Sequence, residues 1–244
     1  MKTAMILAAG LGTRMGHLTV ACPKPLLPLG PYKLIDFTIR KLISAGIQKI
    51  VVNTHYLSEM LETHLMQTWA DQIELKISYE PEILGTGGGI ANAETFFNEE
   101  PVLFCNSDVL TDLDLSRLIR FHNKSGRKAS MVVTPSTDSR NYSLIHYSDK
   151  MEMLDILPKG SRLPERGFTG IFTGFQVLSP EVRKMLKPSF SSVIDAVYRK
   201  LLKNGEPAGI LEHTGLWLDI GTRERYEDVQ RKVEKGIFSL KTIL

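Results

Sequence analysis

The chain has 244 residues, of which 43% are hydrophobic, enough apolar material for one α/β domain with a substantial core. Thirty basic and 27 acidic residues leave a formal charge of +3 without a long run of like charges, so a nucleic-acid partner is not expected. No segment approaches the roughly 18 apolar residues of a membrane helix. Cys22 and Cys105 form no metal-binding pattern, and we expect reduced thiols in a cytoplasmic protein.

Short apolar runs alternate with helical periodicity in the first half of the chain, which predicts βαβ units and a largely parallel sheet. The expected strands are residues 5–9, 49–54, 74–79 and 101–105, and the expected helices are residues 32–45, 57–66 and 87–96. Ligand-binding loops are therefore expected where these strands end.

The second half begins with a helix after Asp114 and a strand at residues 129–134. Strand-like spacing then continues to about residue 178 and includes possible hairpins near residues 148–151 and 158–167. The remaining expected elements are helices at 180–186 and 190–204, a strand pair at 207–211 and 215–219, and a last helix at 222–235.

A glycine-rich loop, AAGLGTRMG at residues 8–16, follows the first strand and lets backbone N–H groups approach a phosphate. It is not a dinucleotide fingerprint, because Met15 occupies the third glycine position, and no Gly-Lys-Ser/Thr of a P-loop follows. A simple tight turn explains the glycines alone about equally well. Arg14, and Lys24 between two stiffening prolines, add cations suited to a triphosphate.

A second glycine-rich stretch, EPEILGTGGG at residues 80–89, follows the third strand and opens a helix whose positive end faces the same edge. A flexible loop with a helix start is the alternative. The Glu80 carboxylate accepts hydrogen bonds and donates none, which favours guanine or uracil over adenine or cytosine. The choice between guanine and uracil stays open.

Two strands end in aspartates: Asp108 follows the fourth strand, and Asp219 follows a strand near the end of the chain. Capping of turns or helices is the alternative for both. Asp112 and Asp114 form a D-x-D pair as in metal-dependent glycosyltransferases, although helix capping explains these two residues better. The six histidines show no catalytic spacing, and no Ser-His-Asp arrangement is present.

Taken together, the segments LAAGLGTRM (residues 7–15), LT (18–19), PKPLL (23–27) and LGTGG (84–88) resemble the signature of sugar-1-phosphate nucleotidylyltransferases. The resemblance covers nearly the whole chain and is strongest to bacterial members acting on N-acetylmuramate, mannose or heptose 1-phosphates. The sequence departs from the family at residues 16–17 and at Ser107. The implied fold is a single three-layer, Rossmann-like α/β domain over residues 1–244 with a mixed, mostly parallel sheet. Its nucleotide-binding half would span about residues 1–125 and its sugar-phosphate half about 126–244.

The resemblance implies Mg²⁺-dependent transfer of UMP or GMP from UTP or GTP to a sugar 1-phosphate, in nucleotide-sugar synthesis for cell wall or surface polysaccharide. It assigns catalysis to Arg14 and Lys24 and metal binding to Asp108 and Asp219. The implied nucleotide-binding set is Leu7, Ala8, Ala9, Gly10, Gly12, Thr13, Arg14, Lys24, Glu80, Gly85 and Thr86, and the sugar-binding set is Gly87, Asn106, Thr173 and Gly174. A glycosyltransferase and a non-catalytic nucleotide-sugar sensor are the alternatives, and a monomer or homodimer is expected.

Overall fold

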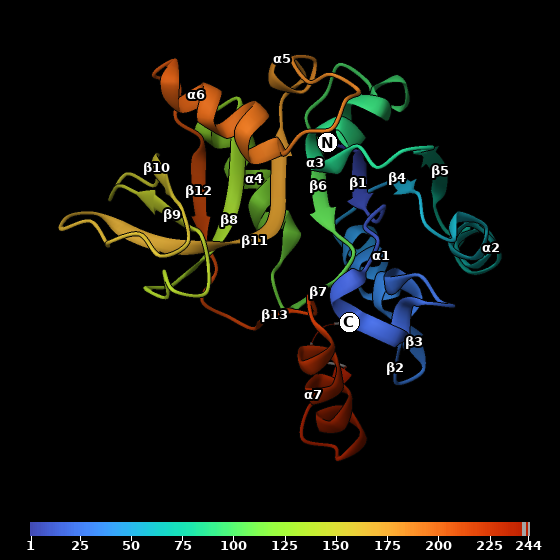
Figure 1. Ribbon diagram of the computed structural model, residues 1–244. Coiled ribbons are helices and arrows are strands. Elements are labelled where there is room, and N and C mark those ends of the chain that lie inside the picture. Colours follow the sequence, from blue (N-terminus) through green and yellow to red (C-terminus); the bar gives the residue numbers. More distant parts are fainter. Residues whose placement is uncertain (241–242, 244) are drawn as a thin grey trace.

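A central mixed sheet of nine strands organises the computed structural model, which describes residues 1–240 and residue 243 (Figure 1). Its strand order is β10-β9-β11-β6-β1-β4-β5, and β8 and β12 extend it from β11. The strands are β1 (Thr3–Leu7), β4 (Lys49–Thr54), β5 (Glu74–Tyr79), β6 (Val102–Asn106), β8 (Ala129–Pro135), β9 (Leu144–Tyr147), β10 (Met153–Leu157), β11 (Phe168–Leu178) and β12 (Gly209–Glu212).

Within this sheet the pairings give seven strands one direction, and β10 and β11 run the opposite way. The predicted mixed, mostly parallel sheet is therefore confirmed. Two short pairs lie outside it: β2 (Pro28–Leu29) with β3 (Tyr32–Lys33), and β7 (Val109–Thr111) with β13 (Trp217–Asp219).

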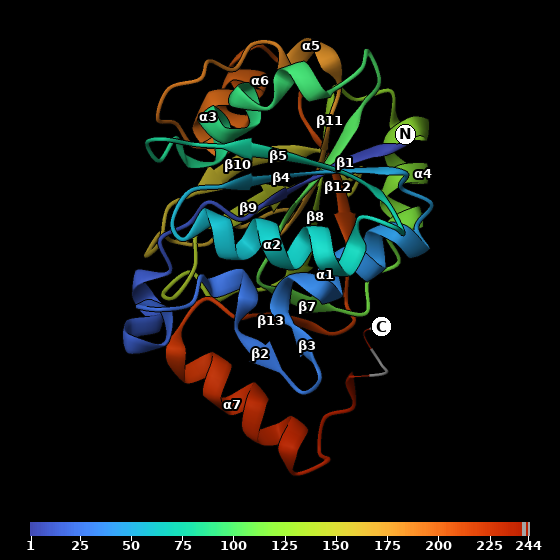
Figure 2. The ribbon, with the colours of Figure 1, turned by 90° about the vertical axis from the view of Figure 1, so that its right-hand side faces the viewer.

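Helices cover both faces of the sheet, which gives the predicted three layers (Figure 2). One face carries α1 (Leu34–Ser44), α2 (Ser58–Trp69) and α4 (Leu115–Ser125). The other carries α3 (Gly85–Asn92), α5 (Pro180–Arg183), a π-helical segment (Ile194–Tyr198) and α6 (Arg199–Lys203). The last helix, α7 (Arg223–Glu234), lies farther from the sheet than α1 and packs against the segments before α1 (Figure 2).

Alternation along each strand explains the layers. In β1, Ala4 and Ile6 pack into the core with α1, whereas Met5 packs into the core with α3 and α6, and all three are fully buried. Side chains of successive strand residues point to opposite faces, so a strand covered on both faces is apolar throughout. Among the described residues, no helix is long and apolar enough to cross a membrane.

Two of the predicted connections differ from the structure. Residues 158–167 join β10 to β11, but β9 lies between those strands, so this segment is not a hairpin turn. The predicted strands at 207–211 and 215–219 form as β12 and β13, yet they pair with β8 and β7 rather than with each other. Local patterns predicted that these strands exist, but their partners depend on the rest of the fold.

Strand β11 bends where the sheet passes from one half of the chain to the other. It pairs with β6 at Phe175–Leu178 and with β9 at Phe168–Gly170, and its register against β8 shifts between Phe172 and Gln176. Gly174 lies in this bulge with φ +91°, a conformation that favours glycine. The bend brings the carboxyl-terminal half of the chain against the edge where β6 ends.

His122 on α4 is buried as a neutral imidazole. We therefore expect the free energy of unfolding to depend on pH through this residue. Its ring nitrogens contact the hydroxyls of Ser130 (3.0 Å) and Ser179 (3.3 Å). Burial lowers its pKa from 6.5 to about 4, although Glu181 opposes the shift.

The unfolded chain therefore takes up a proton at this histidine at a higher pH than the folded chain does. The contribution of His122 to the free energy of unfolding is complete above pH ~6.5 and declines by up to about 3 kcal/mol as the pH falls to ~4. We expect His122→Gln to flatten the decline in urea-unfolding free energy over this range. The exposed-histidine control His17→Gln should keep the wild-type slope, and equal slopes for the two variants would refute the assignment.

Candidate active site

A cavity of about 470 Å³ opens where β1, β4, β5 and β6 end. The chain leaves β1 toward β4 on one side, whereas β6 lies on the other side, and Leu7 pairs with Asn106 between them. The loops after β1 and β6 therefore diverge, which opens a crevice at the carboxyl ends of parallel strands.

The cavity gathers the complete nucleotide-binding set that the sequence predicted, together with two further predicted residues, Asn106 and Asp108. The remaining lining residues are Leu11, Pro25, Asn53, Ile83, Ser107 and Gly221. Gly87, Thr173, Gly174 and Asp219 do not line this cavity.

The first glycine loop is a tight turn as well as a cavity wall. Gly12 has φ +67°, and a Cβ there would lie 3.0 Å from the Thr19 side chain and 3.3 Å from Lys24. Its carbonyl accepts hydrogen bonds from the Met15 N–H (2.8 Å) and the Thr19 hydroxyl (3.0 Å). The turn and phosphate interpretations of these glycines are thus compatible, because the turn is what directs the loop over the cavity. Arg14 is an exposed residue of this loop and lines the cavity.

Asn53, which the sequence analysis missed, joins three strand ends beneath the cavity. Its side-chain oxygen accepts from the Ala8 N–H (2.7 Å), and its amide nitrogen donates to Glu80 Oε1 (2.7 Å). The other Glu80 oxygen accepts from the Leu84 N–H (2.9 Å), and Glu80 is fully buried. A polar residue at the carboxyl end of a predicted parallel strand, as in Ile50-Val51-Val52-Asn53, is the signal that indicates it.

Glu80 thus differs from its expected role as a free base-reading carboxylate. Both of its oxygens are already bonded to the protein, so a base contact would have to replace or share one of these bonds. What the structure shows is a support that fixes Asn53 and the start of the second glycine loop. Its contact with a base stays a prediction.

The second glycine loop packs tightly against residues 189–193. The Gly87 N–H donates to the Ser191 carbonyl (2.8 Å), and the Thr86 hydroxyl accepts from the Val193 N–H (2.9 Å). A Cβ on Gly88 would lie 2.3 Å from the Ser189 carbonyl oxygen. The glycines here therefore allow two backbones to approach, which explains why Gly87 faces this contact and not the cavity.

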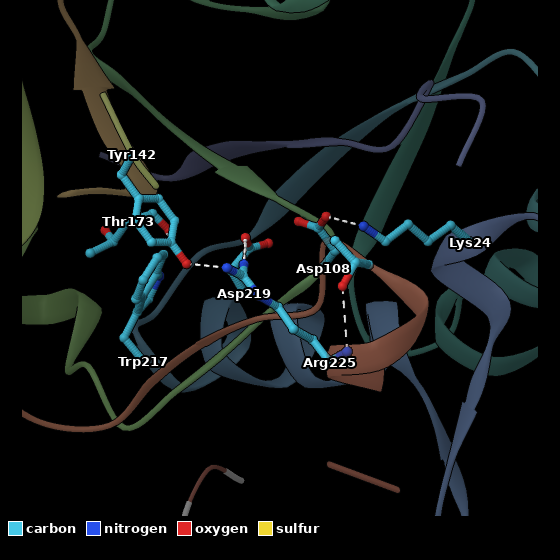
Figure 3. A network of polar contacts seen from close by, with 8 residues as sticks. Lys24, Asp108, Tyr142, Thr173, Trp217, Asp219 and Arg225 are labelled. Atoms are coloured by element: carbon cyan, nitrogen blue, oxygen red, sulfur yellow. Dashed lines mark hydrogen bonds and ion pairs between the residues drawn. The ribbon is translucent and has the colours of Figure 1, made fainter. Parts of the chain in front are cut away.

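Asp108 and Asp219 are brought together by the β7–β13 pair. Asp219 is the register partner of Val109, and the Ile220 N–H donates to the Asp108 carbonyl (2.9 Å). Each carboxylate is paired with a cation through its Oδ2: Asp108 with Lys24, and Asp219 with Arg225 (Figure 3). Burial, followed by the neighbouring Asp108 charge, raises the pKa of Asp219, while Arg225, Lys24 and Arg14 oppose this.

These two carboxylates fit a divalent cation. Each has a second oxygen, and the repulsion between the two charges is relieved by a cation placed near both. No group of three or more acidic, His or Cys side chains forms a metal cluster in residues 1–240 and 243. A metal held here would complete its shell with water and substrate oxygens, which is the preference of Mg²⁺.

The predicted sugar-side residues serve the fold more than expected. The Thr173 hydroxyl donates to the Val132 carbonyl (3.0 Å), so its proton is engaged and only its lone pairs could meet a sugar; its contact with a sugar stays a prediction. The Thr173 carbonyl accepts from the Trp217 indole N–H (3.1 Å). A Cβ on Gly174 would lie 2.8 Å from Asn106 Nδ2, so this glycine leaves room for the one sugar-side residue that does line the cavity.

The D-x-D pair lies outside the cavity. Asp114 caps α4 by accepting from the Ser116 N–H (2.8 Å), as the capping interpretation predicted. Asp112 pairs with the buried His213 (2.9 Å). The residues on which the glycosyltransferase alternative depends are therefore engaged in structural contacts.

Glu80→Gln tests the support beneath the cavity. An amide group would set an N–H against Asn53 Nδ2 or the Leu84 N–H, leaving one donor without an acceptor. We expect a loss of about 1–3 kcal/mol in the free energy of unfolding by urea, with weaker binding of a fluorescent nucleoside triphosphate. The matched control is Glu82→Gln, at an exposed position in the same loop, and a similar stability for both variants would contradict this role.

The nucleotidyl transferase family matches residues 3–236 of the chain. N-acetylmuramate alpha-1-phosphate uridylyltransferase of Neisseria meningitidis serogroup B is 33% identical over 93% of this chain and 96% of that protein. Mannose-1-phosphate guanylyltransferase catalytic subunit beta of Drosophila melanogaster is 28% identical over 89% of the chain, which spans only 59% of that relative's length.

Solved structures share the fold. HddC from Yersinia pseudotuberculosis superposes with a TM-score of 0.78 at 23% identity, covering 96% of this chain and 100% of that one. A putative glucose-1-phosphate thymidylyltransferase from Bacillus anthracis gives a TM-score of 0.80 at 19% identity, covering 99% and 98%. By its sequence and its fold, this chain belongs to the nucleotidyl transferase family.

Proposed function

We propose that this protein is a Mg²⁺-dependent sugar-1-phosphate nucleotidylyltransferase that makes a nucleotide sugar in the cytoplasm. The observation that carries the proposal is the cavity where β1, β4, β5 and β6 end, which gathers the glycine loops, Arg14, Lys24 and Asp108, with Asp219 beside it. A small anionic substrate and a cation are the ligands that such a set binds.

The reaction that fits this arrangement is an in-line displacement. An oxygen of the sugar phosphate attacks the α-phosphorus of the nucleoside triphosphate, a new P–O bond forms, and the α–β bridging bond breaks to release pyrophosphate. A phosphate monoester has a second pKa of about 6 and is largely dianionic at neutral pH, so no protein base is needed. That agrees with a cavity whose described lining contains no histidine and no cysteine.

Catalysis then consists of positioning and neutralising charge. Lys24 is nearly buried, with 10% of its side chain exposed, and prolines on both sides hold it next to Asp108. The exposed Arg14, which lines the cavity from the glycine loop, would contact the phosphates. Asp108 and Asp219 would hold Mg²⁺, which when bound neutralises phosphate charge and orients the two substrates.

The substrates follow from the relatives and from the Glu80 chemistry. Two relatives are named as a uridylyltransferase and a guanylyltransferase, and HddC has been solved with GMP-PN. Uracil and guanine both offer N–H groups to a carboxylate, as the sequence predicted. We therefore propose UTP or GTP as the donor, and N-acetylmuramate 1-phosphate or mannose 1-phosphate as the acceptor.

Pyrophosphate release tests the reaction. We expect release with Mg²⁺ from one pair when the four nucleoside triphosphates are crossed with N-acetylmuramate, mannose, heptose and glucose 1-phosphates. Asp108→Asn should lower kcat by at least about 10²-fold, because it removes a metal carboxylate while keeping the shape. Nucleotide binding without release from any pair would favour the sensor, and release of free nucleoside diphosphate from a nucleotide sugar would favour the glycosyltransferase.

Lys24→Met tests charge stabilisation separately from metal binding. The methionine retains most of the buried stem but removes the ammonium group from Asp108. We expect kcat to fall by about 10²–10³-fold with a smaller change in the KM of the sugar phosphate. Lys33→Met, at another lysine near the start of α1, is the control, and a wild-type kcat in Lys24→Met would exclude the proposed role.

A further inference from the structure

Arg225, which the sequence did not single out, lies beside Asp219 at the start of α7 (Figure 3). Its guanidinium pairs with Asp219 and donates to the Tyr142 hydroxyl. The Arg225 guanidinium carbon is 5.4 Å from the centre of the Tyr142 ring, and that ring packs edge-to-face on Trp217 at 6.4 Å. Arg225 is therefore held between Asp219, a predicted metal ligand, and the aromatic pair formed by Tyr142 and Trp217.

This aromatic pair and Lys24 lie on opposite sides of Asp108 and Asp219 (Figure 3). Lys24 lines the cavity with the glycine loops, whereas Arg225, Tyr142 and Trp217 do not. Trp217 is also tied to the bulge of β11 through its bond to the Thr173 carbonyl. The two aspartates are thus flanked by Lys24 on the side of the cavity and by Arg225 on the side of Tyr142 and Trp217.

Arg225 also has donors to spare. A guanidinium carries five N–H groups, and the structure uses one for Asp219 and one for Tyr142. Its side chain is 40% exposed, so a ligand can approach it from solvent. A divalent cation would itself neutralise Asp219, and Arg225 would then carry a charge that an anionic ligand can match.

We propose that Arg225 binds the phosphate of the sugar 1-phosphate, and that Tyr142 is the positioning residue that orients its guanidinium. The inference rests on the proposed function and adds an acceptor-side cation to it. Lys24 and Arg14 would then serve the triphosphate, and Arg225 the attacking phosphate. A guanidinium suits this place because it binds two phosphate oxygens side by side.

The test uses Arg225→Met, which keeps the stem of the side chain and removes the charge. First, Mn²⁺ binding to the substrate-free protein is measured by electron paramagnetic resonance, and we expect about three- to tenfold tighter binding because a positive charge beside the metal is lost. Second, we expect the KM for the sugar 1-phosphate to rise about 10–100-fold, with the KM of the nucleotide within about twofold of wild type. Tyr142→Phe should raise the same KM about threefold.

The two readouts separate binding from structure. If Arg225 merely held Asp219 in place, Mn²⁺ binding would weaken instead of tightening, and this result would overturn the proposal. An unchanged KM for the sugar 1-phosphate of the active pair would do the same. Arg231→Met, at an exposed position of the same helix, is the control and should match wild type.

Failure of this proposal is distinguishable from failure of the proposed function. Wild-type turnover together with unchanged values in Arg225→Met rejects the role of Arg225 alone. Absence of wild-type turnover with every pair rejects the reaction, and unchanged or weaker Mn²⁺ binding by Arg225→Met in that case rejects the charge assignment as well.

Discussion

The pairing of β7 with β13 is the interaction on which the site depends. It is a short antiparallel ladder that places Asp219 opposite Val109, directly after Asp108. Without it, two carboxylates from distant parts of the chain would not be held close enough to bind one cation. The hydrogen bond from the Ile220 N–H to the Asp108 carbonyl fixes the same juxtaposition from the backbone. The proposed metal site would therefore rest on main-chain bonds, with the side chains completing it.

Charge balance explains the side chains around this pair. Burial raises the pKa of Asp219, and repulsion by the neighbouring Asp108 carboxylate raises it further. Lys24 and Arg225 offset it, one on each carboxylate. Both cations thus offset carboxylate charge in the free protein, and under the proposed function both would already be in position for anionic substrates. The same contacts serve stability and preorganisation.

Support from beneath is the second requirement. Asn53 and Glu80 connect the ends of β4 and β5 to the first glycine loop, and the residues joined by these bonds are all buried. A Cβ on Gly89 would lie 2.6 Å from Glu80 Oε1. Helix α3, which begins in the second glycine loop, can therefore pack on this network only through a glycine. The glycines of the two loops therefore have different structural roles. Those of the first shape a turn over the cavity, and those of the second allow a backbone to pack against its support.

The sequence by itself determined the layers of the fold and most of the cavity. Short apolar runs predicted β4 and β5 to the residue. The family resemblance of the motifs in the first half implied the nucleotide-binding set, and these residues line one cavity because residues close in sequence at strand ends stay close in space. Tertiary structure decided the rest. Strand pairing chose the partners of β12 and β13, buried hydrogen bonds occupied the Glu80 carboxylate and the Thr173 hydroxyl, and α7 delivered Arg225 to Asp219. These outcomes depend on contacts between segments far apart in the chain. Local sequence patterns cannot predict such contacts, because they reflect only the conformations of neighbouring residues.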